Sequence, residues 1–195
     1  MGNNQTSAMN QNNIGTLNLI IGCMYAGKTT RLIDTYNDAI DNDENVIILT
    51  HSSENRYSLD EISTHDLKKI SCVKYMSIAS FIDNEINTIE SSDIILIDEA
   101  QFFDDLLDVL TMVETYNKKV YVFGLDGDFK RNVFGKILEL IPLCDSIEKL
   151  TSVCKCGGNA LFSNRTINNE TQVLVGSNDV YEPLCRKCYV TKNNK

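Results

Sequence analysis

The chain has 195 residues, of which 27 are acidic and 18 are basic, so its net charge is −9 at pH 7. This acidic balance disfavours a nucleic acid as partner, because Lys and Arg supply most of the affinity of such complexes. With 43% apolar and 23% charged residues, we expect one globular domain with room for a small appendage. No apolar run approaches the roughly 20 residues of a membrane helix, and no secretory signal is recognisable, so the sequence predicts a cytoplasmic protein without a membrane partner.

The first 13 residues are rich in asparagine and glutamine and nearly lack apolar side chains, so we expect a disordered tail over residues 1–13. Met1 to Thr6 fit the N-myristoylation pattern M-G-x-x-x-[ST]. No basic cluster follows to supply the second signal that stable anchoring requires, so an unmodified terminus is the favoured interpretation.

From residue 17 the sequence predicts a strand, a glycine turn and a helix in immediate succession. An apolar run from Leu17 to Ile21 precedes the turn, and the segment from Lys28 to Ile40 is amphipathic. The turn matches the phosphate-binding pattern G-x-x-x-x-G-K-[ST], whose chance occurrence in a chain this long is on the order of one in a hundred. We expect a nucleoside triphosphate here, with the Lys on the β/γ-phosphates and the Thr on Mg²⁺. The matching residues are Gly22, Cys23, Met24, Tyr25, Ala26, Gly27, Lys28 and Thr29.

Strands and helices alternate through the next hundred residues, which indicates an α/β fold with a parallel sheet flanked by helices on both faces. Ligands of such sheets bind at the carboxyl ends of the strands, where the glycine turn, Asp98-Glu99 and Leu125-Asp126-Gly127 converge. The predicted elements are strands Val46–Thr50, Ile70–Tyr75, Ile94–Ile97 and Val120–Leu125, and helices Ile78–Asn87 and Asp104–Tyr116.

An acid pair follows the strand at 94–97. Asp98 has the position of a carboxylate that holds Mg²⁺, and Glu99 is placed to accept the proton of an attacking hydroxyl or water. The alternative interpretation is a solvated acid pair that caps the next helix. With the phosphate-binding turn upstream, we favour the functional interpretation.

The chain contains seven cysteines, an odd number that favours reduced thiols or metal ligands over disulfides. Four of them form two close pairs that flank strand-like stretches at Ala160–Arg165 and Thr171–Val175, the arrangement of a small zinc ribbon. The first pair is one residue closer than the common lower limit, and unliganded thiols are the alternative. The predicted ligands of a structural Zn²⁺ are Cys154, Cys156, Cys185 and Cys188.

The ordered motifs resemble the type II thymidine kinases of the cytosol, bacteria and large DNA viruses, over roughly residues 17–190. The motifs that carry the resemblance are Gly22–Thr30, Arg56-Tyr57, Thr64-His65-Asp66, Asp98–Phe103, Leu125–Arg131 with Phe134-Gly135, and the cysteine pairs.

The resemblance implies a RecA-like P-loop NTPase domain over residues 14–150 and a zinc-ribbon lid that binds the nucleoside over residues 151–192. It also implies transfer of the γ-phosphate of ATP to the 5′-hydroxyl of thymidine with Mg²⁺, homotetramers and feedback inhibition by dTTP. Glu99 would be the general base, while Asp98, Arg56, Gln101 and the glycine turn would bind ATP and its metal. The implied thymidine contacts are Met24, Phe102, Leu125, Phe129, Phe134, Ser163, Val173, Leu174, Val175, Gly176, Ser177 and Tyr181.

Two other functions compete with this interpretation. The run Asp98-Glu99-Ala100-Gln101 resembles a helicase motif, but such motors need two ATPase lobes, and the acidity of the chain does not suit a channel for a nucleic acid strand. A zinc-ribbon regulator with a vestigial nucleotide site would bind ATP and zinc without turnover.

Overall fold

In the computed structural model of the chain, the described residues are 14–53, 61–63, 69–174 and 180–193, and the side chains of 61–63 and 69–71 are not described. Several expectations lie outside these ranges. They are the Asn-rich tail with its myristoylation pattern, Arg56-Tyr57, Thr64-His65-Asp66, and Val175, Gly176 and Ser177 of the predicted base-binding loop.

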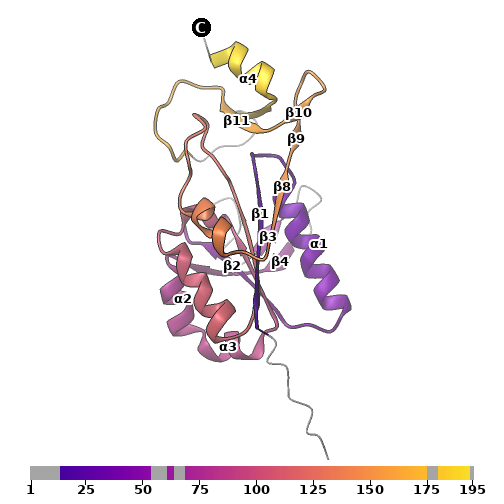
Figure 1. Cartoon of the computed structure of the whole chain (residues 1–195), viewed down its shortest axis with the longest axis vertical. Coiled ribbons are helices and arrows are strands. Elements are labelled where there is room, and N and C mark those ends of the chain that lie inside the picture. The colour runs from indigo at the N-terminus through magenta and orange to yellow at the C-terminus, as the bar shows by residue number, and fades with distance from the viewer. Residues whose placement is uncertain (1–13, 54–60, 64–68, 175–179, 194–195) are drawn as a thin grey trace, which may run out of the picture.

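A six-stranded sheet, parallel throughout, forms the body of the molecule (Figure 1). The strand order is β5-β2-β6-β7-β1-β8, so the strand before the glycine turn, β1, lies between β7 and the edge strand β8. The predicted α/β fold is therefore confirmed. The strands are β1 (Thr16–Gly22), β2 (Val46–His51), β5 (Val73–Tyr75), β6 (Ile94–Asp98), β7 (Lys119–Gly124) and β8 (Ser146–Leu150). The edge strand β8 was not predicted, because its side chains are mostly exposed and its sequence lacks an apolar run.

Helices cover both faces of the sheet. On one face, Leu32 and Ile33 of α1 (Lys28–Asp41) pack among Ile20, Leu96 and Phe123 of the strands. On the opposite face, α2 (Ile78–Asn84) and α3 (Ile86–Ser91) cover the remaining strand side chains. Alternate residues of each strand therefore enter two separate cores, which is why the strands read as continuous apolar runs.

Three details of the helices differ from expectation. Ile40, the apolar residue that ends the predicted amphipathic segment, is 45% exposed instead of packing against the sheet. The helix predicted at Ile78–Asn87 divides at Glu85 into α2 and α3. The helix predicted at Asp104–Tyr116 begins at Leu106 and is irregular: a 3₁₀ turn, η2 (Leu106–Asp108), continues through Val109 and Leu110 into a π-helical turn, η3 (Thr111–Thr115). Asp105 explains this, because its carboxylate accepts the first two N–H groups of α2 and holds its own backbone in a turn before η2.

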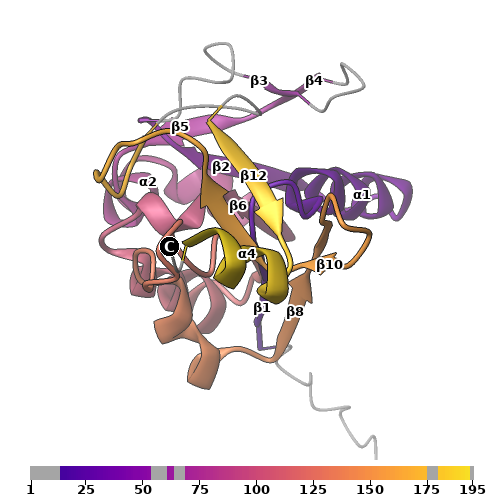
Figure 2. The same ribbon diagram turned by 90° about the horizontal axis from the view of Figure 1, so that it is seen from above.

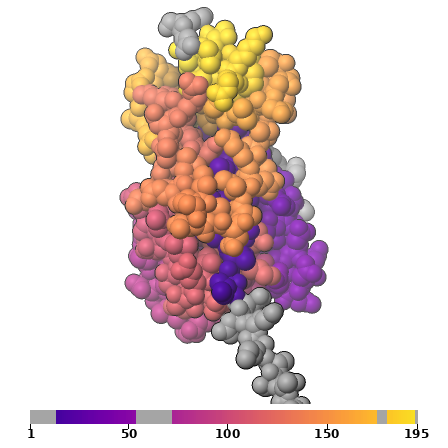
Figure 3. Space-filling model, viewed as in Figure 1, coloured from indigo at the N-terminus to yellow at the C-terminus, as the bar shows by residue number. Residues whose placement is uncertain are grey.

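A small module, residues 151–193, lies over the carboxyl ends of the strands (Figures 1 and 2). It consists of β9 (Ser152–Val153), β10 (Asn159–Ala160), β11 (Phe162–Arg165), β12 (Tyr181–Leu184) and α4 (Arg186–Asn193). The space-filling view shows the module as a cap on the end of the sheet domain (Figure 3). The antiparallel pair β3 (Glu61–Ser63) and β4 (Lys69–Ser71) lies apart from both.

The pairing inside this cap differs from the predicted hairpin. β11 pairs antiparallel with β12, and residues 171–174 form no strand. The carbonyls of Asn169, Thr171 and Gln172 all accept hydrogen bonds from the Arg165 guanidinium, which satisfies them without a strand partner. As far as the chain is described, its longest helix is too short and too polar to cross a membrane.

Candidate active site

The glycine turn lies between β1 and α1, at the carboxyl edge of the sheet. Its chain turns sharply at Tyr25, which adopts a left-handed backbone conformation with φ of 62°, and α1 begins directly after Gly27. The N-terminus of α1 therefore faces the end of the sheet, where its unpaired N–H groups and dipole favour an anion.

Lys28 lies in the first turn of α1 and folds back over the loop. Its Nζ donates to the carbonyl oxygens of Gly22 at 3.2 Å and Cys23 at 2.9 Å. Burial lowers the pKa of the Lys28 ammonium, and the carboxylates of Glu99 and Asp98 oppose that shift. The side chain thus brings a cation to the place where the pattern expects phosphate oxygens.

Asp98 and Glu99 stand at the end of β6, with Asp98 almost fully buried and Glu99 only 9% exposed. Glu99 has φ of 51°, so the chain reverses direction there and its backbone N–H donates to Asp98 Oδ1 at 2.9 Å. A left-handed backbone at a non-glycine residue is strained and is common at functional sites. The two carboxylates therefore lie next to each other at the carboxyl ends of the strands, and β6 is two strands away from β1, which precedes the glycine turn.

Gln101 fixes the direction of the Glu99 side chain. Its Nε2 donates to Glu99 Oε2 at 2.6 Å, while its Oε1 accepts the backbone N–H of Leu125 at 2.9 Å. One buried amide therefore connects the carboxylate after β6 with the chain after β7. The sequence interpretation placed Gln101 at ATP, whereas its hydrogen bonds lie between the acid pair and the pocket described below.

Gly135 makes this arrangement sterically possible. It has φ of 59°, and a Cβ at this position would lie 2.1 Å from the backbone oxygen of Gln101. The loop after β7 therefore packs directly on the 3₁₀ turn η1 (Ala100–Phe102) that carries Gln101. A side chain at residue 135 would separate the two segments.

A pocket opens between the glycine turn, the chain after β7 and the C-terminal cap. It brings together six of the predicted thymidine contacts and three residues that were not among the predicted contacts. The predicted ones are Met24, Leu125, Phe129, Phe134, Ser163 and Tyr181, and the additional ones are Gly127, Asp128 and Gln172. A hydrogen bond from the Met24 backbone N–H to Ser163 Oγ, 3.0 Å long, closes the pocket between turn and cap.

Three other predicted contacts, Phe102, Val173 and Leu174, are among the described residues. Phe102 does not line it, but packs edge-on against Phe134 with ring centroids 5.6 Å apart. Val173 is 52% exposed, and Leu174 is half-buried. Asp128 was not predicted as a contact, because most of its hydrogen bonds lie within its own loop. Its carboxylate accepts backbone N–H groups within its own loop and also the side-chain amide of Gln172. Nothing in the sequence around Gln172 indicates this contact.

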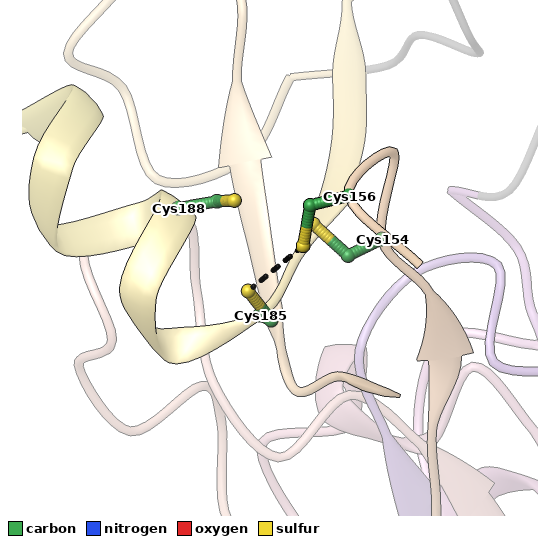
Figure 4. A group of neighbouring side chains, drawn as sticks. All are labelled: Cys154, Cys156, Cys185 and Cys188. Carbon is green, nitrogen blue, oxygen red and sulfur yellow. Dashed lines mark hydrogen bonds between the residues drawn. The ribbon is translucent and has the colours of Figure 1, made fainter. Parts of the chain in front are cut away.

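Four cysteines of the cap face one another (Figure 4), and their sulfur atoms all lie within 4.8 Å of each other. The backbone N–H groups of Cys156 and Cys185 lower the pKa of the Cys154 thiol to about 6, whereas hydrogen bonds with Cys156, Cys185 and Cys154 raise the pKa of the Cys188 thiol to about 12. Four thiolates at about 2.3 Å from a tetrahedral Zn²⁺ would be separated by about 3.8 Å. The Sγ atoms of Cys156 and Cys185 are 3.5 Å apart, so the cluster fits a metal of this kind.

Comparison with known proteins identifies relatives along nearly the whole chain. A family model described as thymidine kinase matches residues 15–189. A thymidine kinase of rice is 42% identical over 180 residues, covering 90% of this chain and 66% of the rice protein. A thymidine kinase of Bacteroides thetaiotaomicron is 40% identical over 180 residues, covering 90% and 87%. A thymidine kinase of Amsacta moorei entomopoxvirus is 39% identical over 178 residues, covering 89% and 97%.

These matches include the glycine turn, the acid pair after β6 and the pocket between turn and cap, so the features of the site and the relatives lead to the same assignment. The match extends to Tyr189 and therefore takes in all four clustered cysteines. The chain belongs to the thymidine kinase family.

Proposed function

We propose that this chain phosphorylates thymidine, transferring the γ-phosphate of ATP to the 5′-hydroxyl to give dTMP and ADP. The observation that carries the proposal is the position of Glu99. Its buried carboxylate is close enough to Lys28, in the first turn of α1, to oppose the lowering of the pKa of that ammonium by burial, and it is oriented by Gln101, which also bonds to Leu125 of the pocket with aromatic walls. That is the place where a nucleoside hydroxyl must meet a phosphoryl group.

The residues at the sheet edge divide the work of phosphoryl transfer. Residues 22–29 enclose the triphosphate with backbone N–H groups, and Lys28 exchanges its bonds to the loop carbonyls for bonds to phosphate oxygens. Thr29 and Asp98 are the residues that would hold Mg²⁺, which neutralises the charge of the transferring group. Arg56, outside the described residues, is assigned to phosphate charge from the resemblance alone.

Glu99 accepts the proton of the 5′-hydroxyl while the 5′-oxygen of the nucleoside forms a bond to the γ-phosphorus. The bond from the γ-phosphorus to ADP breaks, and ADP leaves. The geometry favours this role because the hydrogen bond from Gln101 holds one carboxylate oxygen and fixes the side chain. A positioned base of this kind contributes about 10²–10⁴-fold to the rate. Asp98 is assigned to Mg²⁺ instead, because it stands at the end of a buried strand, the position of a metal-holding carboxylate in phosphoryl transfer.

The pocket residues position the nucleoside. Phe129, Phe134 and Tyr181 supply planar surfaces for a base, and Met24 and Leu125 enclose it. The resemblance adds that residues 173–177 bind the base edge through backbone groups and that Phe102 contributes to the enclosure. Packing around the base would exclude water that could otherwise take the phosphoryl group.

The cap is assigned as a lid domain over residues 151–192, stabilised by a structural Zn²⁺ on the four cysteines, with residues 14–150 as the nucleotide-binding P-loop domain. The compact sulfur cluster supports the metal. The family resemblance supports a cytoplasmic homotetramer inhibited by dTTP, and the low basic content supports the expectation that no nucleic acid is bound.

The test is incubation of the protein with γ-labelled ATP, Mg²⁺ and a panel of nucleosides, with and without single-stranded DNA. We expect labelled thymidine monophosphate, little ATP hydrolysis without a nucleoside, and no stimulation by DNA. DNA-dependent hydrolysis without nucleoside phosphorylation would instead indicate a nucleic-acid-stimulated ATPase. Binding of ATP without any turnover would indicate a regulator.

A further inference from the structure

Arg165, at the end of β11, is a buried cation in the cap. It is only 8% exposed, and among the described residues no carboxylate lies within ion-pair distance of its guanidinium. Its Nε is buried without a hydrogen-bond partner. Removing an Arg from water in this way is costly unless its other N–H groups are well satisfied.

The guanidinium holds the segment that connects β11 to the predicted base-binding loop. Nη1 donates to the carbonyl oxygen of Asn169 at 2.8 Å and also to that of Thr171, and Nη2 donates to that of Gln172 at 3.1 Å. This stretch has no regular secondary structure, so one side chain replaces the ladder that would otherwise fix its path. The segment leads directly into residues 173–177.

The same guanidinium also contacts two aromatic walls of the pocket. It stacks on the ring of Phe129, 3.8 Å from the centroid, and Nη2 donates to Tyr181 Oη at 2.6 Å. The Tyr181 hydroxyl in turn donates to the carbonyl oxygen of Leu174 at 3.0 Å. Arg165 thus reaches the loop by a second route, through the hydroxyl of a pocket residue.

Gln172 is held from the opposite side as well. Its Nε2 donates to Asp128 Oδ2 at 3.1 Å, in the loop that follows β7. Asp128 is itself fixed by the backbone N–H groups of Lys130 and Asn132. The segment therefore lies between a guanidinium on its backbone and a carboxylate on its side chain.

Arg165 does not line the pocket, yet it contacts Phe129, Gln172 and Tyr181, which do. We propose that Arg165 is a positioning residue for nucleoside binding: it sets the path of the 169–174 segment and the orientation of two aromatic walls from behind the pocket. This inference rests on the proposed function, and it assigns to Arg165 no contact with the nucleoside, ATP or the transferring phosphate.

The test is the Arg165→Lys variant, assayed with thymidine and ATP varied separately and with thymidine affinity measured by calorimetry. Lys keeps the charge but lacks the planar fork that bridges several acceptors and stacks on a ring. We expect the KM and Kd for thymidine to rise by about tenfold or more, with kcat and the KM for ATP within about twofold, the signature of lost substrate binding. A purely structural role would lower the melting temperature and the active fraction, while leaving both KM values unchanged.

Arg186→Lys is the matched control, since Arg186 stacks on Phe162 in the same cap but is exposed and lies outside the pocket. It should leave the thymidine KM unchanged. If Arg165→Lys does not fold, Tyr181→Phe decides, because it removes only the hydroxyl that connects Arg165 to Leu174. Its thymidine KM should rise, and an unchanged value would overturn the proposal.

An Arg165→Lys enzyme with a thymidine KM within about twofold of the parent, or with equal rises in both KM values, would also refute the proposal. These outcomes differ from failure of the proposed function. If the unmodified chain forms no thymidine monophosphate, the function itself is wrong. If the unmodified chain is active and the variants behave like it, only the role of Arg165 is wrong.

Discussion

Replacing Glu99 by Gln tests the assignment of the base most directly. The substitution changes one oxygen to an amide nitrogen and leaves the shape of the side chain. The amide carbonyl can still accept the hydrogen bond from Gln101 Nε2, now 2.6 Å long to Glu99 Oε2, so we expect a stability loss of about 1 kcal/mol or less. The substituted amide cannot take the proton of the 5′-hydroxyl at neutral pH.

The expected loss of kcat is at least about 100-fold, equivalent to about 2.7 kcal/mol of transition-state stabilisation. The expected loss of transition-state stabilisation is therefore larger than the expected loss of folding stability, so kinetic and unfolding measurements can tell the two apart. The measurement is kcat at saturating thymidine and ATP, together with the Kd for thymidine and a thermal melt. We expect an unchanged melt and a Kd within about threefold of the parent.

Glu114→Gln, at an exposed acid in η3, is the matched control and should retain full activity. A Glu99→Gln enzyme with kcat within about threefold of the parent would refute the reasoning, because the reaction would then proceed without a base at residue 99. A large drop in kcat accompanied by a lower melting temperature would assign Glu99 to structure instead.

Three further predictions concern the supports of the site. Lys118→Met should destabilise the fold by about 2–4 kcal/mol in denaturant unfolding, because the buried Nζ of Lys118 donates to two backbone carbonyls near the end of α3. The control Lys119→Met removes a half-exposed ion pair and should cost about 1 kcal/mol or less. Gly135→Ala should lower both the stability and kcat, because the added Cβ would collide with the backbone of η1. In the control Gly157→Ala the added Cβ meets nothing within 4 Å, so only the strain of its left-handed backbone remains, about 1–2 kcal/mol. Equal losses of stability in the two variants would contradict this account. Protein purified without chelator should contain about one zinc per chain by elemental analysis, and Cys188→Ser should lose the metal and lower the melting temperature of the cap; a much lower zinc content in the parent would remove the metal assignment.

The sheet and the glycine turn were predictable because their signals are local. Buried parallel strands appear as continuous apolar runs, and four such runs correspond to β1, β2, β6 and β7 within one or two residues. The cysteine cluster was predictable from spacing, although the first pair is short. The edge strand β8 and the turns η2 and η3 were not, since exposure and a distant hydrogen bond from Asp105 determine them.

The pairing of the strands in the cap was also not predictable, because it too depends on contacts between residues distant in the sequence. The stretches Ala160–Arg165 and Thr171–Val175 are both strand-like in sequence, and a hairpin between them was therefore predicted. In the structure one buried guanidinium takes carbonyls of the second stretch, and β12 pairs with β11 in its place. Nothing in the sequence near Arg165 distinguishes it from an exposed arginine, because its burial depends on Phe129 and Tyr181, which lie far from it along the chain.

By itself the sequence determined which residues to expect at the site: a turn with the phosphate-binding pattern, an acid pair after a buried strand, and four cysteines with metal-ligand spacing. These are contiguous patterns whose residue types follow from what phosphate, protons and zinc require. Only the tertiary structure decided how Glu99 is held, which side chains form the pocket, and what fixes the chain that leads to the base-binding loop. Those features depend on Gln101, Asp128 and Arg165, whose partners come from other elements and meet only when the sheet and the cap are assembled.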